Sequence, residues 1–474
     1  MTGFLMLPTV TDSAPSLKFE IRHFLMIAIP LSAAYLAEFA MFITTKIVVG
    51  KLGYEQLAAV GIAGDLSFEI LVILMGLLSI IGVLAAQAEG AGKKSEVGQS
   101  VRQGLNVATM IGIPTMVFIW NLDLLLTATH QDPVVVELAI PYLRGISGMV
   151  LPVLWFAVFR NFTAALARPL AVMVITVAAV FLNYLLTVWF VHGGFGLASL
   201  GLFGAGLATT IVTWLMFISL TVYVYRKPDL RGYGVFRGAW HLHWPTCKEI
   251  LRLGIPVAGL TFIEAGMFIA VSILSGVIGA KTLAAYGVVM SWAGIPFVIA
   301  LGFAEATMVR VAHAVGRNHI KAVRRAGHLG MTLGVGLLTV LVVIPLGFPD
   351  QIIQMFITPD DPGFDEVSRL ATQFLTVVAL FQVFDGLQAI AARALRGLKD
   401  NVVPLWIAGF GYWVMGIGGG SILAFPYGYG GAGLWWGLAS GLMVTASLLC
   451  WRFNQYSARP LDSDQFVVPR SDRR

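Results

Sequence analysis

The chain has 474 residues, of which 58% are hydrophobic and 12% charged, whereas soluble globular proteins have about 25% charged residues. This composition predicts an all-α polytopic membrane protein and excludes a large soluble domain. The formal net charge of +6 does not indicate a nucleic-acid partner, because the basic residues lie mainly in loops between apolar runs.

Twelve apolar runs are long enough to cross a bilayer, which takes about 20 residues of helix. They lie near Phe24–Val49, Ile62–Ala86, Leu105–Leu126, Val134–Val158, Leu170–Val191, Leu202–Tyr225, Leu253–Gly279, Leu283–Met308, Leu329–Phe348, Leu370–Ala392, Val402–Phe425 and Gly431–Trp451. We assign the basic residues to one set of alternating loops and to the two termini, with the exceptions of Lys46, Lys51, Arg144, Lys281 and Arg369. The positive-inside rule therefore predicts a multi-pass protein of the bacterial inner membrane with both termini in the cytoplasm.

The first half of the chain repeats in the second half. Residues 29–61 read IPLSAAYLAEFAMFITTKIVVGKLGYEQLAAVG, and residues 255–287 read IPVAGLTFIEAGMFIAVSILSGVIGAKTLAAYG. The two segments align without a gap, and the alignment places Glu38 on Glu264. A match of this length at a constant offset indicates an internal duplication.

Each half contains six of the twelve apolar runs, so both halves enter the membrane in the same direction. This arrangement predicts two six-helix lobes related by a pseudo-twofold axis along the membrane normal. We expect a first lobe at residues 1–225, a cytoplasmic linker at 226–251 and a second lobe at 252–474, with a disordered tail from about residue 453.

Polar side chains inside the apolar runs are the candidate functional residues, because an acid at the centre of a membrane helix costs about 2.5–3.5 kcal/mol. The first half offers Glu38 and Glu69 in its first two runs and Asn183 in its fifth. Glu38 is a candidate for binding a cationic substrate, with packing against a neighbouring helix as the alternative. In the second half, Glu305 lies deep in the eighth run.

The strongest candidates are two acids of the second half. Glu264 lies in the seventh run with Thr261 three residues before it, and Asp385 lies in the tenth run between Gln382 and Gln388. Residues three apart share a helix face, so each acid belongs to a polar stripe on an apolar helix. Two carboxylates can share a cation, and Glu264 and Asp385 would be the metal ligands if that cation is Na⁺. The alternative is that they are buried acids that bond to neighbouring helices and hold the bundle together.

Catalytic signatures such as GxSxG and HExxH are absent from the sequence, and so is the nucleotide-binding motif GxxxxGK[ST]. We therefore expect no enzyme activity and no organic cofactor. Transport would then draw its energy from an ion gradient, with Na⁺ or H⁺ as the coupling ion.

Several segments together resemble the multidrug and toxic compound extrusion family, most closely its NorM-like branch. They are IPLSAAYLAE with the following LAAVG, AQAEGAG, FLNYLL with GAGLAT, IPVAGLTFIEAGMF, and ALRGLKD after Asp385. The resemblance extends from about Phe24 to Trp451. It implies a V-shaped bundle of two six-helix lobes that exports cationic drugs in exchange for sodium ions or protons.

The resemblance also implies site residues. Glu264 matches the family's acid in the seventh helix, Asp385 its acid in the tenth, and Asn183 an asparagine in the fifth. The chain departs from the family in its first lobe, where Thr45 and Ala164 stand at positions that often carry acids. These departures favour coupling through the second lobe.

The sequence thus predicts a cation-coupled antiporter that exports amphipathic, mostly cationic compounds, acts as a monomer and contacts membrane lipids. A flippase for lipid-linked precursors is the alternative, and a membrane-embedded enzyme is a more distant one. A flippase for pyrophosphate lipids would need Arg or Lys in its cavity, whereas the intramembrane charges predicted here are mainly acids. We expect Glu264→Gln and Asp385→Asn to abolish efflux, and Glu38→Gln to have a milder effect.

Overall fold

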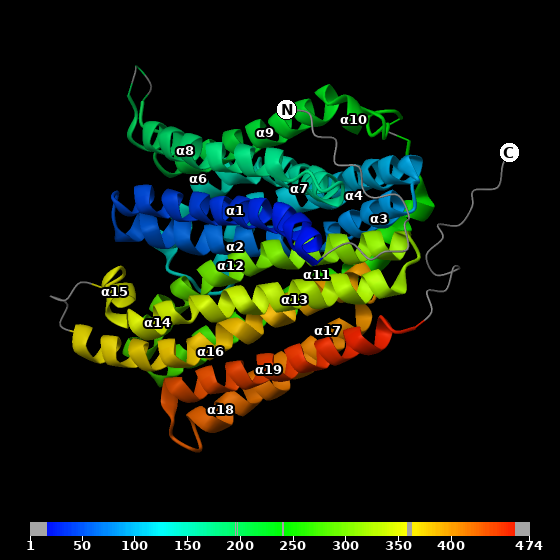
Figure 1. The fold of residues 1–474 in the computed structure, drawn as a ribbon. Coiled ribbons are helices and arrows are strands. Elements are labelled where there is room, and N and C mark those ends of the chain that lie inside the picture. Colours follow the sequence, from blue (N-terminus) through cyan, green and yellow to red (C-terminus); the bar gives the residue numbers. More distant parts are fainter. Residues whose placement is uncertain (1–16, 195, 197, 239–240, 358–362, 460–474) are drawn as a thin grey trace.

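The computed structural model describes residues 17–194, 196, 198–238, 241–357 and 363–459, and almost all of this part is helical (Figure 1). The helices of the first half are α1 (Leu17–Gly50), α2 (Tyr54–Leu78), α3 (Ile80–Gly90), α4 (Lys94–Trp120), α5 (Leu122–Ala128), α6 (Pro133–Ser147), α7 (Val150–Ala165), α8 (Leu170–His192) and α9 (Gly201–Arg226). Those that follow are α10 (Pro228–Arg231), α11 (Trp244–Ile278), α12 (Ala280–Gly316), α13 (Ile320–Leu341), α14 (Val343–Gly347), α15 (Pro349–Gln354), α16 (Phe364–Gly397), α17 (Val402–Gly409), the π-helix η1 (Phe410–Gly418), α18 (Gly419–Ala424) and α19 (Gly430–Tyr456).

Within the described residues, eleven spans are long and apolar enough to cross a membrane, and the bent pair α6 and α7 makes a twelfth if it is one span. The two helices of that pair meet at 46°. Apolar helices suit a bilayer because they satisfy their backbone hydrogen bonds internally. The predicted all-α polytopic architecture is confirmed.

The two halves form two layers of helices (Figure 1). Helices α1–α9 occupy the upper part of this view, and α13–α19 occupy the lower part. The lobes meet mainly where α1 and α3 pack on α12 and where α2 and α4 pack on α11. Helices α1 and α11 contain most of the repeated segments, so the duplicated part of the sequence contributes to the interface between the lobes.

The lobes share a hydrophobic core at the end of the bundle that carries the linker. The second-lobe members of this core come from the helix parts near that end, at residues 247–250, 303–315, 323–331, 390–398 and 449–453. Polar bonds between the lobes lie at the same end: Arg396 Nη1 to Ser79 Oγ (2.8 Å), Gln87 Nε2 to the Gly397 oxygen (2.9 Å) and His313 Nε2 to the Ala165 oxygen (2.7 Å). A second core contains only second-lobe residues. The lobes are therefore joined at the linker end.

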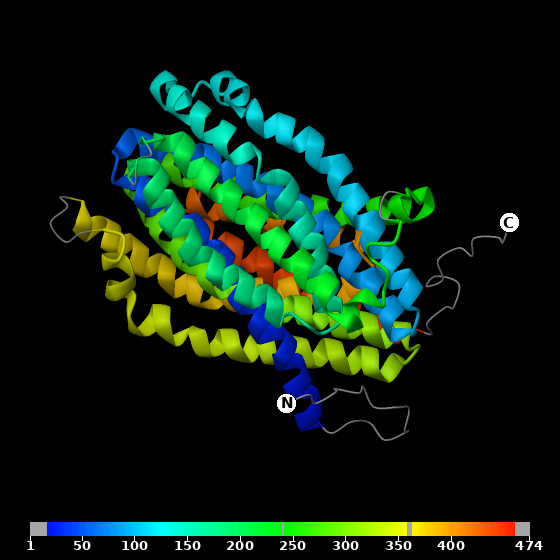
Figure 2. The ribbon, with the colours of Figure 1, turned by 90° about the horizontal axis from the view of Figure 1, so that it is seen from above.

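The predicted linker contains structure of its own. It includes α10, and α11 begins inside it at Trp244. Gln103 of α4 holds this segment by donating to the His241 oxygen (2.9 Å) and accepting from the His243 amide (3.0 Å). Figure 2 shows α10 at the same end of the bundle as the start of α4. At the C-terminus α19 extends to Tyr456, and residues 460–474 of the predicted tail lie outside the described part.

Candidate functional site

Two predicted acids of the second lobe come together between α11 and α16. The side-chain amide of Gln388 donates to Glu264 Oε1 at 3.0 Å and to Asp385 Oδ1 at 3.4 Å. Asp385 and Gln388 are 4% and 1% exposed, and Glu264 is half-buried. Gln388 lies one turn after Asp385 on α16, so the helix itself places the amide beside one acid and aims it at the other.

The π-helix η1 supplies a third side chain to this pair. The Tyr412 hydroxyl donates to Gln388 Oε1 at 2.7 Å, and Tyr412 is fully buried. Among the described residues, no group of three or more His, Cys, Asp or Glu side chains could hold a metal ion. A sodium ion at this site would therefore combine the carboxylates of Glu264 and Asp385 with neutral oxygen atoms.

Glu305 is buried beside an arginine of α16. Its carboxylate Oε2 lies 3.5 Å from Nε of Arg393, and Glu305 is 3% exposed. Arg393 and Arg396 both belong to α16, and both are near enough to act on the charge of Glu264. The second-lobe acids therefore share their surroundings with two arginine residues.

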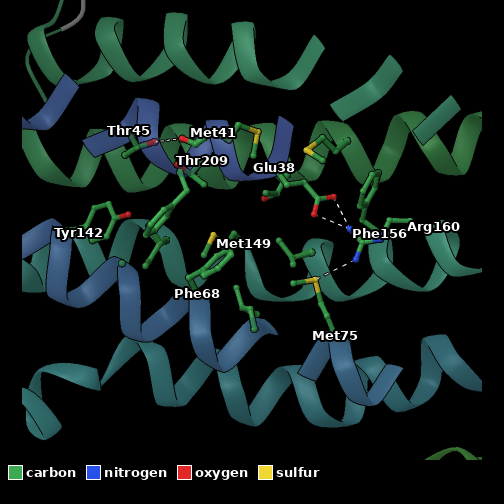
Figure 3. A pocket seen from close by; sticks show the side chains of 17 residues that line it. Glu38, Met41, Thr45, Phe68, Met75, Tyr142, Met149, Phe156, Arg160 and Thr209 are labelled. Atoms are coloured by element: carbon green, nitrogen blue, oxygen red, sulfur yellow. Dashed lines mark hydrogen bonds and ion pairs between the residues drawn. The ribbon is translucent and has the colours of Figure 1, made fainter. Parts of the chain in front are cut away.

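The first lobe contains a cavity of about 110 Å³ (Figure 3). Its wall is mainly apolar and includes methionine, aromatic and threonine side chains from α1, α2, α6, α7 and α9. The lining residues are Glu38, Met41, Phe42, Thr45, Gly64, Phe68, Leu71, Met75, Tyr142, Ile146, Met149, Val153, Phe156, Arg160, Thr209, Thr213 and Met216. Methionine is flexible and polarisable, and therefore suits a surface that adapts to different ligands.

An ion pair lies at one end of this cavity (Figure 3). Nη1 of Arg160 donates to both carboxylate oxygens of Glu38, at 2.7 and 2.8 Å. The guanidinium also lies over the Tyr35 ring, 4.7 Å from its centroid. Because Glu38 already has a buried cationic partner, it does not present a free negative charge to a substrate.

Asn183 lies in the wall behind the same cavity. It is fully buried on α8 and accepts from the Thr45 hydroxyl at 3.2 Å, while its amide donates to Thr209 at 3.3 Å. Both threonines line the cavity. The position where the resembled family often has an acid is thus occupied here by a hydroxyl that bonds to Asn183.

The remaining predicted residues do not join the pair of acids directly. Gln382 donates to the Leu338 oxygen of α13 at 3.3 Å. Thr261 bonds to its own helix at the Val257 oxygen (3.2 Å). Glu69 is half-buried on α2, where its charge acts on Glu264. The structure therefore brings Glu264, Asp385 and Gln388 together and places the other predicted residues outside this group.

Sequence reasoning missed two buried arginines, Arg160 and Arg396, the half-buried Arg393, and one tyrosine. These arginines lie near the ends of apolar runs, where the charge pattern assigns them to the basic loops. The expectation that intramembrane charges are mainly acids therefore needs correction. A signal was present, because Arg160 and Arg396 occupy matching places in the two repeats. Tyr412 gave no such signal, since a tyrosine in an apolar helix is unremarkable by composition.

A sequence model of the MatE family matches residues 30–189 and 256–422. The chain belongs to the MatE family. The model matches twice, once in each half, which agrees with the internal repeat. Among curated relatives, "Probable multidrug resistance protein NorM" of Mesorhizobium japonicum is 37% identical over 92% of this chain and 93% of the relative. The protein of the same name from Pseudomonas aeruginosa is 35% identical over 95% of this chain and 92% of that relative.

Solved structures of MATE transporters share the fold. The crystal structure of the eukaryotic MATE transporter AtDTX14 superposes with a TM-score of 0.83 at 21% identity, covering 95% of this chain and 99% of that one. A structure described as the outward-facing conformation of a multidrug resistance MATE family transporter gives 0.82 at 20% identity, covering 94% and 97%. The chain is thus a multi-pass multidrug-efflux transporter of the NorM-like branch; its curated relatives are named as multidrug resistance proteins, and the solved structures that share its fold are named as transporters.

Proposed function

We propose that this MatE transporter exports amphipathic, mostly cationic compounds in exchange for Na⁺ or H⁺ across the bacterial inner membrane. The observation that carries the proposal is the meeting of Glu264 and Asp385 at one amide inside an apolar bundle. Two carboxylates at this depth are costly unless a cation or proton offsets their charge. The reported relatives, named as multidrug resistance proteins, favour this cargo over the lipid precursors of a flippase.

Exchange follows from competition for the same carboxylates. In the state open to the outside, the external ion occupies Glu264 and Asp385, and the drug leaves. In the state open to the cytoplasm, the ion departs and the freed negative charge attracts the next cationic compound. Each ligand shifts the transporter only toward the state that it binds better. Outward movement of the drug is therefore coupled to inward movement of the ion.

The contacts between the lobes support an assignment of the conformation. If the linker faces the cytoplasm, as the charge pattern predicts, the shared core and the inter-lobe bonds of Arg396 and Gln87 close the cytoplasmic side. The structure then corresponds to the outward-open half of the cycle. Opening to the cytoplasm requires these bonds to break and the lobes to separate at the linker end.

The cavity of the first lobe suits the apolar part of the cargo. Four methionines and several aromatic rings line it, and aromatic faces also attract cations that have lost water. Its one acid, Glu38, is neutralised by Arg160. The cavity therefore contributes apolar contact, whereas the free negative charge is supplied by the second lobe.

Efflux of a cationic dye from cells that express the chain tests the proposal. We expect efflux in the wild type that stops when the ion gradients are collapsed. Glu264→Gln and Asp385→Asn keep the side-chain shapes and remove the charges, so we expect normal expression without gradient-driven efflux. Transport of a lipid-linked precursor by a chain that moves no cationic dye would favour the flippase instead.

A further inference from the structure

The environment of Tyr412 restricts what its hydroxyl can do. Tyr412 is fully buried, and its hydroxyl donates to Gln388 Oε1 at 2.7 Å. Gln388 is 1% exposed. The Tyr412 hydroxyl therefore occupies the side-chain oxygen of Gln388, and the burial of Gln388 keeps water away from its amide.

The ionised acids decide which end of the Gln388 amide faces them, and the Tyr412 hydroxyl satisfies the other end. An ionised carboxylate can only accept hydrogen bonds, and an amide offers donors only at its nitrogen. With Oε1 bound to Tyr412, Nε2 points to Glu264 (3.0 Å) and Asp385 (3.4 Å). The amide is thus a shared donor to both carboxylates.

The π-helix holds Tyr412 in place. The neighbouring Gly411 packs so closely on α19 that an added Cβ would lie 1.9 Å from the Thr445 hydroxyl oxygen and 3.0 Å from the Gly441 oxygen. The Gly441 position is equally tight, with the Gly411 oxygen 2.4 Å from an added Cβ. π-helical turns occur frequently at functional sites, and this one fixes the depth at which the tyrosine reaches α16.

We infer that Tyr412 is a positioning residue of the cation site: by donating to Oε1 it holds the Gln388 amide and strengthens it as a donor to the empty, ionised pair of Glu264 and Asp385, and thereby promotes release of the coupling ion. The inference rests on the proposed function. The donor stabilises the carboxylates when they hold no cation, and both a proton and a sodium ion must compete with it. Without the hydroxyl, Oε1 becomes a buried acceptor with no partner and Nε2 becomes a weaker donor. The empty pair is then less stable, and the bound ion is held more tightly.

Tyr412→Phe removes only this hydroxyl, and Tyr286→Phe is a matched control. Tyr286 is also buried in the second lobe, but its hydroxyl donates to the Phe268 backbone oxygen at 2.9 Å. We expect Tyr412→Phe to lower the ion concentration for half-maximal dye exchange at least about threefold and to slow the maximal rate. The free energy that corresponds to a threefold shift is a modest part of what a hydrogen bond to a charged group contributes, because 1.4 kcal/mol corresponds to a tenfold change in a binding constant. Tyr286→Phe should match the wild type in both.

Gln388→Leu separates positioning from a general structural effect. If the hydroxyl acts through the amide, Tyr412→Phe should cause no further shift in the Gln388→Leu background. An equal shift in both backgrounds, or no shift in the single variant relative to Tyr286→Phe, would overturn the inference. Thermal unfolding of each purified variant shows whether any change in rate reflects loss of folded protein.

Ion binding to the purified protein keeps this test independent of transport. Intrinsic fluorescence is titrated with NaCl at fixed pH, and with acid in the absence of sodium. Other groups that act on the pair, namely Glu69 on α2 and Arg393 and Arg396 on α16, are unchanged in every variant. Absence of gradient-driven efflux in the wild type refutes the proposed function, whereas the inference is overturned if the Tyr412→Phe midpoint equals that of the wild type or if neither ion produces a titration.

Discussion

We expect removal of Glu38 and removal of Arg160, the two partners of the first-lobe ion pair, to lower the free energy of unfolding by different amounts. Breaking a buried pair by removing one partner costs about 3–5 kcal/mol, because it leaves an uncompensated charge. The Arg160 side chain is 7% exposed, whereas the Glu38 side chain is 22% exposed and lines the cavity. Glu38→Gln strands the more deeply buried charge, so we expect a loss of unfolding free energy near that range.

Arg160→Met leaves a carboxylate at the edge of the cavity, where it can take up a proton or contact water. We expect a smaller loss, about 1–3 kcal/mol, similar to that for an unsatisfied buried polar group. The double variant Glu38→Gln/Arg160→Met removes both charges and should be more stable than Glu38→Gln alone, because replacing a buried pair by neutral groups is often close to neutral. The coupling is read from thermal or denaturant unfolding in detergent. The explanation would be refuted if the two losses of unfolding free energy simply add in the double variant, or if Arg160→Met loses more than Glu38→Gln.

Three further predictions concern packing, cargo and topology. Gly437→Ala should lower the free energy of unfolding by about 1–3 kcal/mol through overpacking, because an added Cβ would lie 2.2 Å from the Gly420 Cα. Gly419→Ala should be close to neutral, because its added Cβ meets nothing within 4 Å, and equal thermal stabilities of the two variants would contradict this. Met149→Trp fills the first-lobe cavity and should slow efflux of bulky aromatic cations several-fold at normal expression, and an unchanged dye-efflux rate would exclude the cavity from the transport path. Cysteines placed at Lys281 and Lys321 should react with impermeant reagents from opposite sides of the membrane, and labelling from one side would refute the topology.

Much of the fold was predictable from the sequence, because apolar helices and an ungapped repeat can be recognised without knowing how the helices pack. The candidate acids were predictable for a related reason, since Glu264 and Asp385 interrupt long apolar runs. Their meeting at Gln388 was only partly predictable. Helix spacing places Gln388 beside Asp385, but the approach of Glu264 depends on how α12, which packs on both α11 and α16, places these two helices.

Other features depend on packing between distant segments. Tyr412 reaches Gln388 from a π-helical turn whose sequence, FGYWVMGIG, is equally compatible with an ordinary α-helix. The first-lobe cavity draws its wall from five helices, so no single run of sequence reveals it. Arg160 shows why the expected mild effect of Glu38→Gln needs revision: the structure gives that acid a buried partner, so this variant disturbs stability as well as charge.

The central claim is that the ion couples to transport through the second lobe. The most direct measurement is dye exchange in proteoliposomes driven by a sodium gradient at fixed pH and then by a pH gradient without sodium. The wild type should respond to at least one gradient, and Glu264→Gln and Asp385→Asn to neither. The charge-neutral Glu38→Gln/Arg160→Met variant should retain exchange. Wild-type exchange in both second-lobe variants, with loss of exchange in a folded first-lobe variant, would contradict the account.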